Sequence, residues 1–590
     1  YGQHMKGTTD RMVALDAKDG EILWKAPHYP SGYQSPEDLL IVNDRVLAPF
    51  TTWLRAKGPD TNKLMGVDLE TGRIAHDEKP NVEDPVWFIH HRCYPSKATS
   101  DFLLTSKEGV EFINQENWNS KIHHWVRGAC LYGIMPANGL LYAPMHDCAC
   151  SADMKLSGFN ALAAPRARSS SEVDVKDYRL TKGPAYGKAR NPQAPIDDSD
   201  WPTYRHDAAR SGVASCGAPV PPSRAWEADV GGKPSAPVVA GGRVYVAAVD
   251  RHTLHVFDED TGAELWTFTA EGRIDSPPTI YKGMVLFGSR DGCVYCLRAS
   301  DGELIWRFRA VAQDRRLMAM GQMESVWPVH GSILIRNGEA WFVAGRSVFL
   351  DGGLQIYRLK PETGEVLSRA TFDGKAPDGG PLTGAEQKRL VGLPDVLSAS
   401  DGRIFMRAGV IEPDGNTIEK RLLPESHVIR YSGGGKRTDG HNIKGASHPH
   451  LFSSYGFLDD SWFHGSYWVY SYKYGNRHSY FRTGESRPAG RILVCDDETV
   501  YGFGRQQKYF DWSTPLEYRL FARGKKGNWE EALIWNKKSP GLLATGLVLA
   551  GDTLFAAGPP DVLNEDMARI RYESSETRKK MEKQADALEG

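Results

Sequence analysis

Short apolar runs separated by turn residues recur along the chain. Residues 243–249 (Arg-Val-Tyr-Val-Ala-Ala-Val) and 283–288 (Gly-Met-Val-Leu-Phe-Gly) are rich in β-branched and aromatic side chains and are bounded by glycine. Runs of this length and composition are typical of β-strands. Between Lys282 and Arg307 two such strand pairs follow each other with hardly a spare residue. The pattern predicts an all-β protein.

A ten-residue sequence motif recurs between these runs, and we call it the repeated phrase. It reads Leu-Asp-Ala-Lys-Asp-Gly-Glu-Ile-Leu-Trp at 15–24 and recurs at 257–266 and 297–306, with weaker copies beginning at Val67 and Leu359. Two successive copies are 40 residues apart (302 − 262), and a propeller blade takes roughly 40–50 residues. The aspartate can bond the backbone of the turn, and the glycine supplies a positive φ. The tryptophan offers apolar surface for packing between neighbouring blades.

These phrases resemble the PQQ-like β-propeller repeat. Residues 201–212 (Trp-Pro-Thr-Tyr-Arg-His-Asp-Ala-Ala-Arg-Ser-Gly), 90–94 and 127–130 resemble signatures of large exported PQQ-like propeller proteins of polysaccharide-degrading bacteria. The resemblance implies a β-propeller of about seven to eight four-stranded blades with inserted loops, in a periplasmic, cell-surface or secreted location. It carries no settled activity.

The chain divides at a polar, basic, proline-rich segment. Residues 165–200 show no periodicity and predict a linker between N-terminal blades (1–164) and the remaining blades (201–590), together forming one closed propeller. Residues 310–333 predict an insertion between blades. Residues 565–588 are charged helix formers and predict an exposed helix whose basic run is a solvated face. Because the chain starts within a repeat and shows no closing strand at its end, we expect processing or missing sequence at both ends.

Composition excludes few functions. The 590 residues carry a formal net charge of −2, which gives no signal for nucleic acid. No run of 18 apolar residues occurs, so we expect no membrane span. The oligomeric state stays open.

Titratable side chains gather between residues 87 and 150. On a strand, His90 and Arg92 face one way while His91 faces the other, so only one set can line a pocket. A hairpin around 136–139 returns His146 towards Arg127. We interpret these side chains as candidate catalytic residues: His90, His91, Arg92, Tyr94, His124, Arg127 and His146. The alternative is a set of satisfied polar groups in an irregular blade.

Aromatic, basic and acidic side chains also gather elsewhere, in a mixture that suits sugar rings and their hydroxyls. The candidate substrate-binding residues are Lys97, Tyr204, Arg205, His206, Trp327, His330, His448, His450, Trp462 and His464. The alternative for 204–210 is a loop that locks the two blocks together. The alternative for the region after His441 is an aromatic-rich blade edge.

Eight cysteines are present. Cys93, Cys130, Cys148 and Cys150 could bind zinc or copper together with neighbouring histidines, although disulfides in an exported protein are the favoured alternative. Cys293 and Cys296 form a CxxC pair on a strand, which should place their side chains on opposite faces. We therefore reject a zinc or redox role for that pair.

A polysaccharide lyase acting on a uronate-containing glycan is the function that these residues favour. β-Elimination needs a base such as histidine or tyrosine and cations to stabilise the developing charge, and it requires no cofactor. The expected partner is an acidic polysaccharide or oligosaccharide. The alternatives are a non-catalytic binding or scaffold propeller and a PQQ-dependent dehydrogenase. PQQ is disfavoured because the chain has no Cys-Cys dipeptide and no Cys-x-x-Cys-His haem site.

Overall fold

The computed structural model describes the chain in segments. They are residues 11–27, 39–49, 64–78, 81–82, 95–105, 110–123, 126, 128, 132–144, 156, 158–164, 179–188, 197, 199–375, 380, 392–407, 409–414, 417–420, 449–453, 456–458, 468–471, 488–505, 517–526 and 529–589. The chain forms two compact units. Unit 1 comprises 1–171, 374–392 and 430–437; unit 2 comprises 172–373, 393–429 and 438–590.

Among its described residues, unit 1 consists of antiparallel sheets, apart from one parallel pairing between β7 and β11. In sheet order these are β1 (Arg11–Leu15) and β2 (Ile22–Pro27); β3 (Leu40–Val42), β4 (Arg45–Pro49), β5 (Leu64–Asp68) and β6 (Ile74–Glu78); β7 (Asn81–Val82), β11 (Asn119–His123), β10 (Val110–Asn114), β9 (Phe102–Thr105) and β8 (Lys97–Ala98); and β12 (Met135–Ala137), β13 (Leu140–Ala143) and β14 (Asn160–Ala163).

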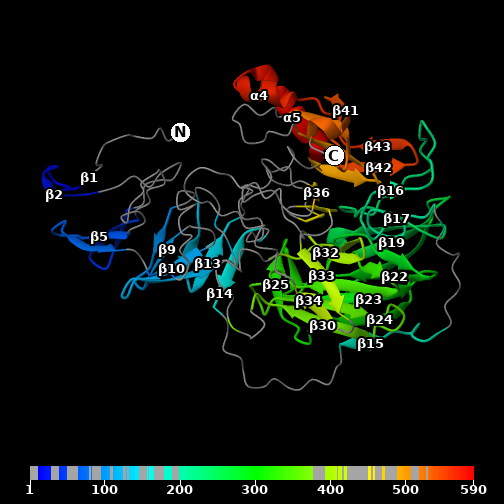
Figure 1. The fold of residues 1–590 in the computed structure, drawn as a ribbon, viewed down its shortest axis with the longest axis horizontal. Coiled ribbons are helices and arrows are strands. Elements are labelled where there is room, and N and C mark those ends of the chain that lie inside the picture. The colour runs from blue at the N-terminus through cyan, green and yellow to red at the C-terminus, as the bar shows by residue number, and fades with distance from the viewer. Residues whose placement is uncertain are drawn as a thin grey trace. The chain divides into compact units, whose positions relative to one another are not determined.

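Unit 2 repeats a four-stranded meander (Figure 1). Its sheets, in chain order, are β17 (Val238–Val239), β18 (Arg243–Ala248), β19 (Thr253–Asp258) and β20 (Glu264–Thr269); β21 (Thr279–Tyr281), β22 (Met284–Gly288), β23 (Cys293–Arg298) and β24 (Leu304–Arg309), extended by β15 (Leu180–Lys182); β27 (Leu334–Arg336), β28 (Glu339–Ala344), β29 (Leu354–Leu359) and β30 (Val366–Phe372); and β31 (Ser398–Ser400), β32 (Arg403–Met406), β33 (Gly409–Asp414) and β34 (Thr417–Lys420).

The described residues of unit 2 form three further sheets, one of which includes the earlier strand β16. They are β35 (His450–Ser453), β36 (Trp468–Ser471) and β37 (Ala489–Gly490); β38 (Ile492–Cys495), β39 (Thr499–Arg505), β40 (Tyr518–Gly524) and β41 (Leu533–Lys538); and β16 (Val213–Ala214), β42 (Gly546–Ala550) and β43 (Thr553–Ala557). The predicted insertion contains a separate hairpin, β25 (Arg316–Ala319) and β26 (Gln322–Ser325). The all-β fold is confirmed; the number of blades and the bounds 1–164, 165–200 and 201–590 stay predictions.

The tryptophan of the repeated phrase, and Trp226 before it, each dock on the glycine of a following copy. The indole Nε1 of Trp266 donates to the Ala299 carbonyl (3.2 Å), and the ring covers Gly302 so closely that a Cβ there would lie 2.5 Å from it. Gly302 has a φ of 76°, so its turn also requires glycine. The same docking joins Trp24 to Gly72, Trp226 to Gly262 and Trp306 to Gly364.

The aspartate of the phrase holds the turn. In two copies its Oδ1 accepts both the backbone N–H and the hydroxyl of the threonine three residues on, from Thr71 to Asp68 and from Thr261 to Asp258. In the copy at 297–306 the aspartate is replaced by Arg298, which forms an ion pair with Asp301 instead (2.6 Å). The turn chemistry predicted from the sequence is therefore present, with one substitution that an ion pair accommodates.

Residues 201–214 tie the first sheet of unit 2 to its last. Trp201 forms a β-bridge with Val239 of β17. A few residues later β16 pairs with β42 in parallel, with Val213 opposite Leu549. The beginning and the end of unit 2 thus meet, which is how closed propellers avoid exposed sheet edges.

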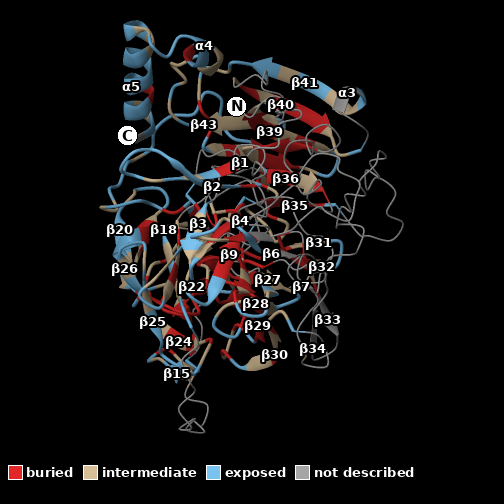
Figure 2. Cartoon of the chain, turned by 90° about the vertical axis from the view of Figure 1, so that its left-hand side faces the viewer, coloured by how far each residue is buried: buried red, intermediate tan, exposed pale blue. Residues whose placement is uncertain are grey.

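The core lies between successive sheets. Cys293 packs in one hydrophobic cluster and Cys296 in another, on opposite faces of β23, which agrees with the rejection of a CxxC site. Both are free thiols. Figure 2 shows β40 as largely buried and α5 as largely exposed.

Helices are few in the described part of the chain. They are a 3₁₀ turn η2 (Val249–Arg251) and the helices α3 (Trp529–Ala532), α4 (Glu565–Ile570) and α5 (Ser575–Glu589). The predicted charged C-terminal helix is confirmed, although it is two helices broken at 571–574. In the segments that the structure describes, no helix has the length and apolar character needed to cross a membrane.

Candidate functional site

Most of the residues singled out in the sequence lie outside the described residues. These are His90, His91, Arg92, Cys93, Tyr94, His124, Arg127, Cys130, His146, Cys148, Cys150, His448, Trp462 and His464. Their roles stay predictions. Lys97 is described: it is half-buried on β8, an edge strand of its sheet in unit 1.

Residues 203–211 form a buried loop that we call the loop lock. Arg205 donates to the carbonyls of Arg210 (2.8 Å) and Ser211 (3.3 Å), and its guanidinium lies 4.4 Å from the Trp468 ring centroid. Tyr204 donates its hydroxyl to the Phe457 carbonyl (3.1 Å).

Arg210 extends the loop lock to another sheet. Its side chain is fully buried, and it donates to the carbonyls of Leu397 (3.0 Å) and Tyr204 (3.0 Å). Burial lowers the pKa of Arg210 to about 10. His206, which is half-buried, lies beside Trp201 with ring centroids 5.0 Å apart. These contacts favour a role for the loop in joining sheets over a role in binding.

Trp327 and His450 also have internal partners. Trp327 is 5% exposed and donates its indole N–H to the Asp351 carbonyl (3.0 Å). His450 is 3% exposed, stacks on Phe405 and contacts the Arg407 carbonyl through Nε2 (2.7 Å). Both side chains therefore support the surrounding structure.

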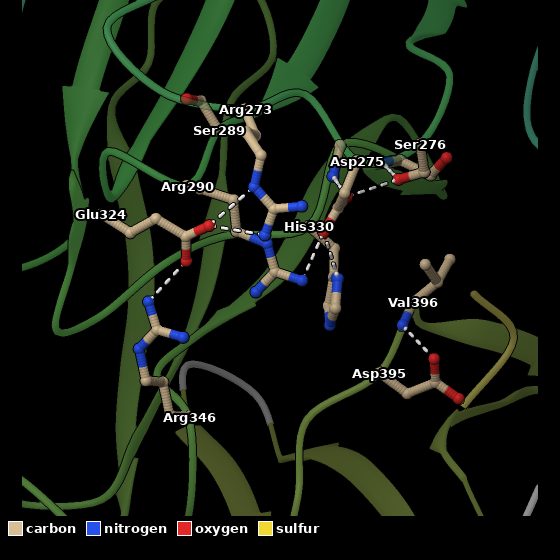
Figure 3. A network of polar contacts seen from close by, with 12 residues as sticks. Arg273, Asp275, Ser276, Ser289, Arg290, Glu324, His330, Arg346, Asp395 and Val396 are labelled. Carbon is tan, nitrogen blue, oxygen red and sulfur yellow. Dashed lines mark hydrogen bonds and ion pairs between the residues drawn. The ribbon is translucent and has the colours of Figure 1, made fainter. Parts of the chain in front are cut away.

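His330 belongs to a different kind of site, which we call the arginine cluster (Figure 3). Its members are Arg273, Asp275, Arg290, Glu324, His330 and Arg346. Asp275 precedes β21 and Arg290 follows β22. Because these two strands are antiparallel, the segments before the first and after the second meet at one end of the sheet.

The cluster joins two successive sheets at that end. Asp275 pairs with Arg290 of its own sheet (2.6 Å) and with Nδ1 of His330, which precedes β27 of the next sheet (3.0 Å). The backbone N–H of Gly331 donates to the same carboxylate (2.8 Å). Asp275 therefore fixes the orientation of the imidazole.

Glu324 holds the other two arginines. Its carboxylate, 1% exposed, contacts Arg273 (2.5 Å) and Arg346 (2.6 Å). The side chains of the three arginines are mostly covered, with Arg346 24%, Arg290 18% and Arg273 12% exposed. Arg273 also lies 3.7 Å from Asp250, so the three arginines face three carboxylates, Asp250, Asp275 and Glu324.

Two carboxyl groups beside His330 have opposite pKa shifts. Burial would raise the pKa of Asp275, but the Arg290 guanidinium and His330 outweigh it and hold that pKa well below its ordinary value. Burial raises the pKa of Asp395, against the opposing influence of Arg407 and His330. Asp395 precedes β31 and accepts the backbone N–H groups of Val396 (2.8 Å) and Phe457 (3.0 Å).

The cluster places guanidinium groups beside an oriented imidazole. Nε2 of His330 is shielded from solvent and has no hydrogen-bond partner among the described residues, and such an atom marks a place where a ligand or water is expected. A carboxylate-oriented imidazole next to guanidinium groups is the combination that proton abstraction next to a carboxylate requires.

Sequence reasoning found only His330 in this cluster. It missed Arg273, Asp275, Arg290, Glu324, Arg346 and the adjacent Asp395. One signal was present: Arg290 and Arg346 each follow the second strand of their sheet by two residues, in the segments Phe-Gly-Ser-Arg (287–290) and Val-Ala-Gly-Arg (343–346). A polar residue that recurs at a fixed place in a repeat points to a shared end of the sheets.

The cluster does not fit PQQ with its metal cation. Such a cation needs carboxylate oxygens that are available as ligands, whereas Asp275 and Glu324 are each engaged by guanidinium groups. The adjacent-cysteine pair of quinoprotein alcohol dehydrogenases is absent from the sequence. We therefore derive no step through this cofactor.

Comparison with known proteins identifies the kind of repeat that the chain carries. Residues 220–409 match the family model described as outer membrane protein assembly factor BamB, which confirms that the chain carries PQQ-like propeller repeats. The protein of that name from Burkholderia pseudomallei (strain K96243) is 30% identical over 140 residues, 24% of this chain and 32% of that protein. Its counterpart in Nitrosomonas eutropha is 30% identical over 93 residues, 16% of this chain and 22% of that protein. The chain thus spans a third or less of the length of these relatives.

Solved structures are more distantly similar. The quinohemoprotein alcohol dehydrogenase ADHIIG from Pseudomonas putida HK5 is 11% identical, with 62% of this chain and 70% of that chain covered and a TM-score of 0.39. BamB from Moraxella catarrhalis is 14% identical, with 68% and 76% covered and a TM-score of 0.20.

Proposed function

We propose that this chain is an exported protein that binds a uronate-containing polysaccharide and cleaves it by β-elimination, with the arginine cluster as its site. The observation that carries the proposal is the His330 imidazole. Asp275 orients it, its Nε2 has no partner among the described residues, and Arg290 lies beside it. No cofactor is required.

The chemistry follows from these groups. Arg290 and Arg346 pair with the uronate carboxylate and stabilise the charge that develops when the neighbouring proton is removed. His330 takes the C5 proton, the C5–H electrons form the C4=C5 double bond, and the C4–O bond breaks. The leaving oxygen needs a proton, for which Asp395 is the candidate because burial keeps it protonated more than an ordinary aspartate.

The test is absorbance at 235 nm with a panel of acidic polysaccharides, since the unsaturated uronate absorbs there. We expect a rise on at least one uronate polymer, and we expect His330→Asn to lower the rate at least about 100-fold. His252→Asn is the matched control: its half-buried ring contacts a side-chain amide, Gln322 (2.6 Å), not a carboxylate. No rise in absorbance on any uronate polymer would contradict the lyase proposal.

A second set of variants separates the two candidate places for the base. If His91→Ala and Tyr94→Phe abolish turnover while His330→Asn leaves it intact, the catalytic groups belong to the 90–146 set. The opposite result assigns them to the arginine cluster.

A non-catalytic binding or scaffold protein is the second candidate. One observation favours it: every member of the arginine cluster lies within 220–409, the segment that matches a family described as an assembly factor. Retarded migration in gels that contain an acidic polysaccharide, with no absorbance at 235 nm, would support this candidate over the lyase.

A further inference from the structure

The hairpin β25–β26 presents three methionines at its tip. Met318 lies directly opposite Met323, and the pair Ala319–Gln322 closes a two-residue turn of Met320 and Gly321. Residues opposite each other on antiparallel strands project from the same face. The three methionines are 64%, 63% and 49% exposed in chain order, which is unusual for a side chain that normally fills cores.

The turn favours a different residue where Met320 stands. Met320 has a φ of 50° and Gly321 a φ of 73°, the combination of a two-residue hairpin turn in which asparagine or aspartate followed by glycine is preferred. A long side chain in this region is an outlier that folding propensity does not explain. An observed outlier of this kind points towards a function of the side chain.

The hairpin is held both next to its turn and towards its base. The side chain of Gln322 contacts Nε2 of His252 (2.6 Å) and donates to the Asp250 carbonyl (2.9 Å). Glu324 is bound by Arg273, and Arg316 contacts Glu271 (3.3 Å). The three exposed methionine side chains therefore project from a fixed support.

We infer that Met318, Met320 and Met323 form a binding site for a soft monovalent cation, Cu(I) in its natural form. Thioether sulfur is a soft ligand that selects Cu(I) over hard cations such as Mg²⁺ and Ca²⁺. The thioether has no proton to lose, so binding should not change between pH 5 and 8, unlike binding by cysteine or histidine.

Silver(I) is the probe, because it shares the ligand preference of Cu(I) and needs no reductant. The full chain carrying Cys216→Ser, which removes an exposed thiol, is titrated with silver nitrate in chloride-free buffer. Replacing the three methionines with leucine should remove one bound equivalent of Ag⁺ while keeping the apolar surface. The control replaces three exposed methionines elsewhere, Met135, Met567 and Met581, and should remove none.

A second measurement does not depend on stoichiometry. Bound Ag⁺ should protect the thioethers from hydrogen peroxide, so peptide mass spectrometry should show at least about fivefold slower oxidation of Met318, Met320 and Met323, but not of Met135. Equal Ag⁺ binding by the hairpin and control variants, or equal oxidation with and without Ag⁺, would overturn the inference.

Discussion

The loop lock and the arginine cluster contain the same residue types and use them differently. In the loop lock, the guanidinium groups of Arg205 and Arg210 donate mainly to backbone carbonyls. In the arginine cluster, the guanidinium groups of Arg290 and Arg346 contact carboxylates and keep part of their surface open. The partner of an arginine, rather than its burial alone, separates the two regions.

The histidines differ in the same way. Nδ1 of His206 is 4.0 Å from Asp207, the residue next to it in the chain. His330 is bound at 3.0 Å by a carboxylate 55 residues away. A long-range partner orients a ring against a fixed support, which is what a base needs. The comparison is the reason for proposing a structural role for the loop lock and a chemical role for the arginine cluster.

The largest expected effect is on stability, from Arg210→Met in the loop lock. The variant leaves the buried carbonyls of Leu397 and Tyr204 without a donor, which should lower the free energy of unfolding by about 3 kcal/mol. Urea denaturation measures it. Arg224→Met, at an arginine 76% exposed in its side chain, should change stability by less than about 0.5 kcal/mol. A loss below about 1 kcal/mol at Arg210 would remove the distinction between the regions.

The next effect is on binding, from Arg346→Gln in the arginine cluster. Glu324 keeps Arg273 as its partner, so unfolding should change by only about 1 kcal/mol. Affinity for a uronate oligosaccharide should fall about tenfold, equivalent to about 1.4 kcal/mol. Calorimetry measures the affinity, with Arg315→Gln, whose side chain is 56% exposed, as the control. Unchanged affinity would indicate that the arginine cluster, like the loop lock, has only a structural role.

The smallest effect is on the pH dependence of stability. The lowered folded-state pKa of Asp275 means that its contribution is present above about pH 4 and is lost as the pH falls through that lower pKa. The raised pKa of Asp395 has the opposite sign: its ionised form costs stability near neutral pH, and acidification towards about pH 4 removes that cost.

Thermal unfolding midpoints across pH test both signs. Asp395→Asn should flatten the curve between about pH 7 and 4, and Asp275→Asn should flatten it below about pH 4. Asp552→Asn, in an exposed turn, should leave the shape unchanged. If Asp275→Asn and Asp395→Asn alter the curve over the same pH range, the two carboxyl groups do not occupy the different environments described above.

The repeat could be predicted from sequence because its determinants are local. Asp258 and Thr261 bond within one turn, and Gly262 needs its positive φ for that same turn. The arginine cluster could not be predicted in this way. Arg273 and Glu324 are 51 residues apart, and their pairing depends on which ends of two sheets meet.

Composition did not decide between binding and a structural role at the loop lock. Tyr204, Arg205 and His206 have the residue types of a binding site, and the sequence does not show that the donors of Arg205 point to carbonyls of its own loop. The direction of a side chain depends on backbone conformation, and both Arg205 and His206 have positive φ values (60° and 78°). Short-range patterns do not predict that conformation for such residues.

The docking of tryptophan on glycine does not by itself limit the number of sheets. The copies at 15–24, 257–266 and 297–306 each place their tryptophan on the glycine of the next copy, so further copies could follow in the same way. The pairing of β16 with β42 supplies this limit. Two short strands, which carry no copy of the phrase, therefore limit how many sheets unit 2 can contain.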